Sequence, residues 1–233
     1  MRVRGEGTVR EPWVRATIVY DSQATEKGLV PGWGFSCLIE TEDQSILFDT
    51  GWDGNALLKN LRFLGTGPAE IQNIFLSHSH WDHIGGLASL LAAGSHARVI
   101  VPTSFNARLK REIGKRAEVL EVDGPVSFAP GCLSTGELGT DILEQSLILK
   151  TAEGLMVLTG CAHPGLGTIL AAAKKTGNVF GVLGGFHDFS DLGLLRGMRM
   201  IMPCHCTSRV GAIRRLYPEV CREGGVGTSI EVA

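Results

Sequence analysis

Length, composition and charge exclude several classes of protein before any motif is considered. The chain has 233 residues, with 22 Lys and Arg against 24 Asp and Glu, so its formal net charge is −2. Such a balance argues against a nucleic-acid scaffold or an electrostatic membrane binder, and no apolar run approaches the roughly 20 residues of a membrane span.

We therefore expect a single domain over residues 1–233. The first residues, Met1–Glu6, contain no apolar signal region, which predicts a cytoplasmic protein. The substrate should be a small molecule, with no nucleic-acid and no membrane partner, and the oligomeric state is left open. Six cysteines are too dilute for a disulfide scaffold in a chain of this length and should be mostly reduced thiols.

The N-terminal part predicts three strands and a helix. Residues 13–21 alternate like a half-buried strand. A glycine-rich loop follows at 28–34, and residues 35–41 and 45–49 form a hairpin that delivers Asp49 to a strand end. Residues 55–64 then read as a helix.

The densest group of chemically active side chains lies at residues 77–86. It contains His78, His80, Asp82 and His83, after an apolar strand at 71–76 and before a helix at 85–94. In an extended segment His78 and His80 point the same way and can reach one cation, while Asp82 and His83 turn toward a second. Two metals roughly 3.5–4 Å apart can hold a hydroxide and polarise a substrate oxygen. The alternative is a surface loop that happens to be rich in histidine.

The middle of the chain predicts a strand and a helix, and then a series of strands without helices between them. This succession is typical of half of a β-sandwich. The loop at 136–141 has room to border a site. No histidine occurs between Val99 and Thr159, and the pair Glu144 and Gln145 in this region could substitute weakly for a histidine ligand. The ranges are 98–102, 104–114, 117–122, 126–128, 133–135, 146–151 and 155–159.

The C-terminal third places further histidines after short apolar runs, so we expect them at the same edge of the sheets. Cys161 and His163 follow the strand at 155–159, with a helix behind them that runs through Lys175. Cys161 is either a soft metal ligand, which would favour zinc or iron over magnesium, or a packed thiol. His187 and His205 follow strands at 178–183 and 198–202. His187 is a ligand or a substrate contact.

Two more cysteines flank the last of these histidines, ahead of the C-terminal elements. Cys204 and Cys206 alternate with His205 and should face the opposite side of an extended segment. We therefore expect neither of them to be a ligand. A helix at 208–217 and a closing strand after Thr228 complete the chain.

Residues 77–86 resemble the signature of the metallo-β-lactamase superfamily, with Ser77 in place of the usual threonine. The resemblance implies an α/β fold, a four-layer αββα sandwich. It also implies that Asp49 supports the metal ligands from behind, although a cap for the helix at 55–64 is an alternative role. Cys161 stands where most members have a bridging aspartate, and His205 corresponds to the last metal-binding histidine. For the missing third histidine we prefer His163.

Three segments narrow the resemblance to one branch, the dihydropterin-ribofuranosylaminobenzene phosphate synthase-like proteins. These segments are Cys161-x-His163, Gly-Gly-Phe-His187 and Pro-Cys-His205-Cys-Thr. The branch implies a metal-assisted condensation of a pterin pyrophosphate with an arylamine. Trp81 and Phe186 could then stack on a flat ring, with packing beneath the metal loops as the alternative for both.

These observations predict a binuclear metal-dependent hydrolase or transferase acting on a phosphate-bearing or other anionic small molecule. Two divalent ions are expected, preferably zinc, with iron or manganese as alternatives. Asp82 would be both ligand and proton acceptor, and His187 a second catalytic group. Competing hypotheses are a mononuclear iron oxygenase or redox protein and a non-catalytic metal-binding module. The expected ligands are His78, His80, Asp82, His83, Cys161, His163 and His205.

Overall fold

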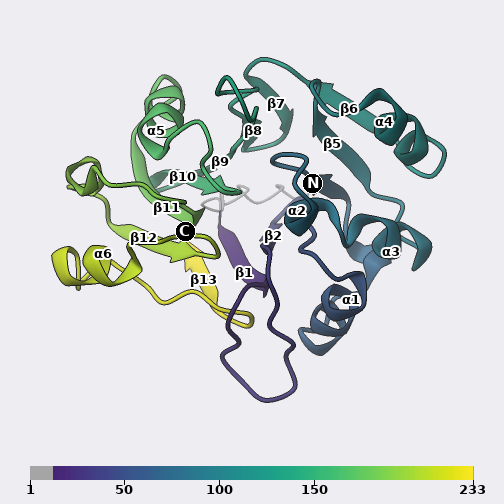
Figure 1. Cartoon of the computed structure of the whole chain (residues 1–233), viewed down its shortest axis with the longest axis horizontal. Helices are drawn as coiled ribbons and strands as arrows, with labels where there is room; N and C mark the ends of the chain where they lie inside the picture. Colours follow the sequence, from purple (N-terminus) through teal and green to yellow (C-terminus); the bar gives the residue numbers. More distant parts are fainter. Residues whose placement is uncertain (1–12, 233) are drawn as a thin grey trace, which may run out of the picture.

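Two β-sheets form the framework of the protein (Figure 1), and the computed structural model describes residues 13–232. The segment Met1–Glu6, on which the expectation about a signal region rests, lies outside the described residues. The seven-stranded first sheet has the order β13 (Ser229–Val232), β1 (Val14–Tyr20), β2 (Ser36–Thr41), β3 (Ser45–Phe48), β4 (Asn73–Phe75), β5 (Arg98–Pro102) and β6 (Val119–Val122). The six-stranded second sheet has the order β12 (Met200–Cys204), β11 (Val179–Gly185), β10 (Gly154–Thr159), β9 (Leu147–Thr151), β8 (Cys132–Ser134) and β7 (Val126–Ala129).

Both sheets are mixed, and the direction of each strand pair follows from its connection. Hairpins make β1, β2 and β3 antiparallel, and they do the same for β7 through β10. Strands β3 to β6 are parallel, as are β10 to β12, because longer connections cross back over the sheet. The helices are α1 (Gly54–Phe63), α2 (Trp81–Ile84), α3 (Leu87–Ala92), α4 (Ala107–Gly114), α5 (Leu166–Lys174) and α6 (Val210–Leu216), with 3₁₀ turns at Pro68–Glu70 and Leu192–Leu195.

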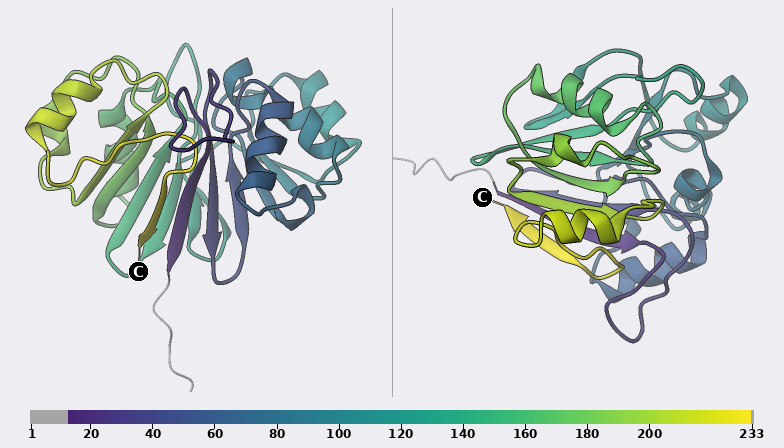
Figure 2. Two further views of the ribbon diagram at one scale, coloured as in Figure 1. Left: turned by 90° about the horizontal axis from the view of Figure 1, so that it is seen from below. Right: turned by 60° about the vertical axis from the view of Figure 1, so that its left-hand side comes forward.

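Three apolar clusters divide the molecule into four layers, which Figure 2 shows edge-on. The central cluster lies between the sheets and includes Phe48, Phe75 and Leu147. A second joins the first sheet to α1, α3 and α4, and a third joins the second sheet to α5 and α6. Strands covered on both faces read as continuous apolar runs, as β11 does. The predicted αββα sandwich is therefore confirmed.

The histidine-rich segment departs from the sequence interpretation in one respect. The structure has a one-turn helix, α2, before α3, where the sequence predicted one helix beginning at Gly85. Asp82 and His83 are thus carried on a helical turn. Gly85 and Gly86 are needed because a Cβ at either position would collide with the backbone carbonyl of Trp52 or of Thr50.

The residues that follow several strands adopt an unusual backbone conformation. Asp49, His187 and His205 follow β3, β11 and β12, and Ala162 lies in the turn after β10. All four have φ between 47° and 60°, in the left-handed region that non-glycine residues rarely enter. Such strain is characteristic of functional sites. Within residues 13–232 no helix is long and apolar enough to cross a membrane.

The core between the sheets yields a prediction for stability. The rings of Phe48 and Phe75 stack with centroids 5.5 Å apart, and Phe75 is fully buried. We expect Phe75→Ala to lower the free energy of unfolding by about 3–5 kcal/mol, measured by urea denaturation. Phe63→Ala, at a ring that is 47% exposed, is the control and should cost less than about 1 kcal/mol. Equal losses would contradict the assignment of the core.

Candidate metal centre

Asp49 organises the histidine-rich segment from beneath. Its carboxylate is fully buried and accepts hydrogen bonds from the Ser77 backbone N–H and from the Ser77 hydroxyl, both at 2.7 Å. It also lies 2.7 Å from Nδ1 of His83. Because the helix α1 is capped by Asp53, the alternative reading of Asp49 as its cap is wrong.

These hydrogen bonds fix which nitrogen of each ring is free. A carboxylate can only accept, so the Ser77 hydroxyl donates to Asp49 and must accept from Nδ1–H of His78, 2.9 Å away. The Nε2 atom of His78 is then left with its lone pair available. Asp49 likewise occupies Nδ1 of His83, so Nε2 is the nitrogen that faces Sγ of Cys161. Burial alone would lower the pKa of the His83 ring, but Asp49 raises it. A serine or threonine at position 77 is therefore part of the site.

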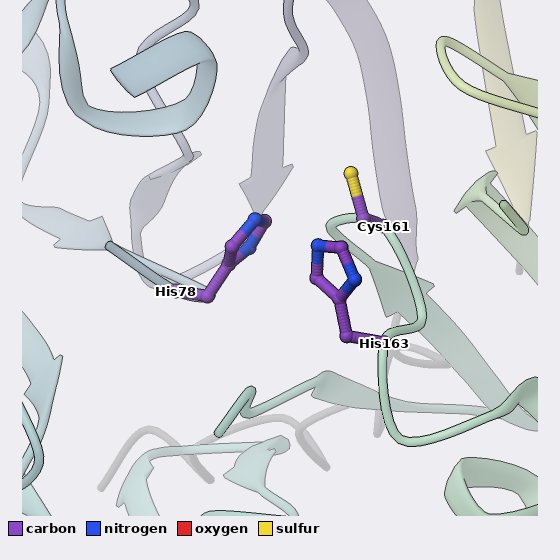
Figure 3. Close-up of side chains that lie close together, drawn as sticks. All are labelled: His78, Cys161 and His163. Atoms are coloured by element: carbon purple, nitrogen blue, oxygen red, sulfur yellow. The ribbon is translucent and has the colours of Figure 1, made fainter. Parts of the chain in front are cut away.

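Three imidazoles surround one point at the rim of the sandwich. The ring centroids of His78, His80 and His163 are 4.6, 4.8 and 4.8 Å apart, and the rings are steeply inclined to one another. Figure 3 shows His78 and His163 turned toward each other from opposite halves of the molecule, with Cys161 beside them. His163 therefore lies beside the His78/His80 pair, as a third histidine donor must.

A second group of donors lies beside the first. Nε2 of His205 is 3.1 Å from Oδ2 of Asp82, and Nε2 of His83 is 3.8 Å from the same oxygen. Burial would raise the pKa of Asp82, but the hydrogen bond from His205 and the charge of His83 lower it to about 2. Asp82 is therefore an anion at neutral pH.

The thiol of Cys161 lies between the two groups. Its sulfur and ligand atoms of His78 and His163 are all within 4.8 Å of one another, and the same holds for its sulfur with His83 and His205. The Sγ atom is 3.2 Å from Nε2 of His83, and the residue is 4% exposed. Cys161 therefore belongs to both of these groups of potential ligands.

Glu144 holds the turn that carries Cys161 and His163. Its carboxylate is fully buried and accepts four backbone N–H groups, from Gly160, Cys161 and Ala162 on Oε1 and from His163 on Oε2, at 3.0–3.1 Å. Burial raises its pKa despite these hydrogen bonds. Sequence reasoning considered Glu144 only as a weak substitute ligand. No local pattern reveals its role, because all four donors lie on a later turn.

The residues expected to contact substrate differ in their exposure. Trp81 is 57% exposed, and the half-exposed His187 lies with its ring centroid 5.1 Å from that of His163. Phe186 is 1% exposed and packs in the cluster beneath α5 and α6, so the prediction that it stacks on a substrate is wrong. Trp33, which sequence reasoning missed, is 57% exposed and its ring lies 4.8 Å from that of His205.

The expectation for the two cysteines beside His205 is only half correct. Cys204 is buried in the core between the sheets, on the far side from the donors. At His205 the chain turns with φ of 49°, which breaks the alternation and returns Cys206 toward Cys161. The contact with Cys161 is the main cause that lowers the pKa of Cys206 to about 6.

The donor set fits divalent metal ions. Nε2 of His78, Nε2 of His163 and Nδ1 of His205 are buried without a hydrogen-bond partner among residues 13–232. Such atoms are rare unless something binds them. Burial and the neighbouring histidines lower the pKa of His163 to about 4 and also lower that of His78, so both rings are neutral, as ligands must be. Imidazole, thiolate and carboxylate together suit zinc or iron.

Comparisons with known proteins agree with this geometry. The chain is 27% identical to 7,8-dihydropterin-6-methyl-4-(β-D-ribofuranosyl)-aminobenzene-5'-phosphate synthase of Methanocaldococcus jannaschii, over 76% of this chain and 82% of that protein. The structure matches Tm1679, a metal-dependent hydrolase of the beta-lactamase superfamily, with TM-score 0.79 and 26% identity over 94% of this chain and 99% of that one. It shares its fold with YhfI of Bacillus subtilis, with TM-score 0.71 and 14% identity over 94% and 99%.

A family model described as the metallo-beta-lactamase superfamily matches residues 31–170, which is more than half of the chain. The match spans Asp49, the histidine-rich segment and the turn with Cys161 and His163. The chain therefore belongs to the metallo-beta-lactamase superfamily.

Proposed function

We propose that the protein is a binuclear metal-dependent hydrolase or transferase whose substrate is a small molecule with a phosphate or another anionic group. One observation carries this proposal: two groups of donors converge from separate strand ends and meet at a single thiol. The first group is His78, His80 and His163, and the second is Asp82, His83 and His205, with Cys161 between them.

Each protein group has a distinct task in this proposal. A bound pair of ions would lower the pKa of a water to about 7 and polarise a substrate oxygen. Asp82, held as an anion beside His205, would accept the proton that such a water loses. His187 is half-exposed next to His163, so it can reach a substrate and exchange a proton with a leaving group.

The substrate side of the proposal rests on exposed aromatic rings. Trp33 and Trp81 are each 57% exposed, and both lie next to potential metal ligands. The ring of Trp33 contacts that of His205, and Trp81 precedes Asp82 in α2. Exposed indoles at a site favour a flat ring in the substrate. The curated relative that makes a pterin compound with a phosphate supports this substrate class.

The first test removes the proposed ligand His80, whose exposed side chain contributes little to packing. We expect the metal-loaded wild type to hydrolyse an activated phosphodiester. Because His80 is exposed, His80→Ala should leave the circular dichroism spectrum unchanged while one of two metal equivalents and this hydrolysis are lost. Elemental analysis and turnover of bis(p-nitrophenyl) phosphate give the two readouts. His96→Ala, an exposed histidine between α3 and β5, is the control and should retain both. Full activity in His80→Ala would refute the proposal, and one iron per chain in the wild type would favour a redox protein.

A second test asks whether the thiol is a ligand. Cys161→Ser should lose one metal equivalent, because a hydroxyl is a poor ligand at neutral pH, whereas Cys161→Asp should keep two because a carboxylate can also bridge. Cys221→Ser, at a thiol on the far side of β12, is the control. Two metal equivalents in Cys161→Ser would mean that Cys161 only packs.

A third test concerns the carboxylate beneath the turn. In Glu144→Gln the new amide N–H group would face backbone N–H donors, so hydrogen bonds to a charged acceptor are lost. We expect a loss of about 2–3 kcal/mol in the free energy of unfolding and a metal affinity about 10–100-fold weaker. Urea denaturation and competition with a chelator measure these. Glu118→Gln, at an exposed glutamate, should behave like the wild type, and an unchanged Glu144→Gln would disprove the anchoring role.

A further inference from the structure

Two consecutive glycines end β11, the strand that lies between β10 and β12 in the second sheet. At Gly185 an added Cβ would lie 2.8 Å from Sγ of Cys206 and 3.2 Å from Cα of Cys161. The absence of a side chain at Gly185 therefore leaves space in which Cys161, after β10, and Cys206, after β12, approach each other. Gly185 thus has a role that the metal donors alone do not explain.

Cys206 contacts Cys161, a potential metal ligand, but does not itself belong to either group of potential ligands. Its Sγ atom is 3.9 Å from the carbonyl oxygen of Cys161. Within the described part of the chain it is in neither group of residues whose ligand atoms could hold an ion, whereas Cys161 is in both. A thiol that lies beside Cys161 but outside both groups can be oxidised first and then be attacked by the Cys161 sulfur, which is then the resolving cysteine.

The other four cysteines do not share this environment. Cys37, Cys132 and Cys204 are buried in the core between the sheets, and Cys221 lies on the far side of β12 beside Ile201. Cys206 is partly exposed, whereas Cys161 is 4% exposed. An oxidant from solvent therefore reaches Cys206 first.

We propose that Cys161 and Cys206 are an oxidation-sensitive dithiol, which a hydroperoxide closes into a disulfide that withdraws Cys161 from the metal centre. The link to the metal centre rests on the proposed function, but formation of the disulfide does not.

The reaction balances with hydrogen peroxide as the oxidant. The peroxide O–O bond breaks as the Cys206 sulfur takes one oxygen to become a sulfenic acid, and the other oxygen leaves as water. The Cys161 sulfur then attacks that sulfur, the S–S bond forms, and the sulfenic oxygen leaves as a second water. Two thiols and one peroxide thus give one disulfide and two waters. Because Cys161 belongs to both donor groups, the disulfide weakens metal binding as a whole.

The test uses reduced, metal-free full-length protein treated with one equivalent of hydrogen peroxide. Free thiols are counted, disulfide-linked peptides are identified by mass spectrometry, and zinc uptake is then measured by elemental analysis. We expect two of the six thiols to be lost, a linked peptide pair containing Cys161 and Cys206, and a fall in zinc uptake of at least one equivalent. Dithiothreitol should restore the zinc uptake, and prior loading with zinc should slow the oxidation.

Two variants separate the possible outcomes. Cys206→Ser should take up zinc like the wild type and keep that uptake after peroxide, whereas Cys221→Ser should respond as the wild type does. If no disulfide joins Cys161 to Cys206, or if Cys206 stops at a sulfinic acid, the dithiol is refuted and the proposed function is untouched. A disulfide with undiminished zinc uptake would refute both the link to the metal centre and the shared-ligand role of Cys161.

Discussion

The buried carboxylate of Asp49 is the constraint on which the site depends. It accepts from Ser77 and from His83 at 2.7 Å, and through Ser77 it also sets the tautomer of His78. One acidic side chain therefore orients His78 toward one proposed ion and His83 toward the other, with Nε2 of each ring facing the site. An unsatisfied carboxylate in this place would be costly to bury, but each of its oxygens has a donor.

A second buried carboxylate, that of Glu144, positions the ligand-bearing turn of the other half of the sandwich. Asp49 follows β3 in the first sheet, and Glu144 precedes β9 in the second, where it fixes the turn with Cys161 and His163. The carboxylate of Asp82, whose pKa is lowered to about 2, also lies close to rings that burial keeps neutral, such as His163. Cations between the two halves would offset this negative charge. The electrostatics therefore favour the same conclusion as the orphaned ring nitrogens.

The sandwich topology explains why donors far apart in the sequence meet. The segments that follow β4, β10 and β12 face one another, because the ring of His78 lies beside that of His163 and the ring of His83 lies beside that of His205. The left-handed backbone of Ala162 and His205 then turns the segments after β10 and β12 inward. A site built in this way can change its donors, for example to a thiol at Cys161, without any change in the strands beneath.

The sequence predicts the features that depend on local patterns, but not those that depend on contacts between residues far apart in the chain. The strands and the cluster from His78 to His83 follow from local periodicity and spacing, which a sequence displays directly, whereas the four-layer sandwich is implied by the family resemblance. The role of Glu144 as an anchor of the turn and the place of Trp33 beside His205 could not be predicted, because their partners come from distant segments. Phe186 was misassigned because α5 and α6 cover it, and Cys206 because strand alternation fails at a left-handed residue.

The most direct test of the account is anomalous X-ray diffraction at the zinc absorption edge from crystals of the zinc-loaded protein. The account predicts two anomalous peaks, one surrounded by His78, His80 and His163 and the other by Asp82, His83 and His205, with the sulfur of Cys161 between them. A single peak, or two peaks with that sulfur turned away from both, would contradict the shared binuclear centre.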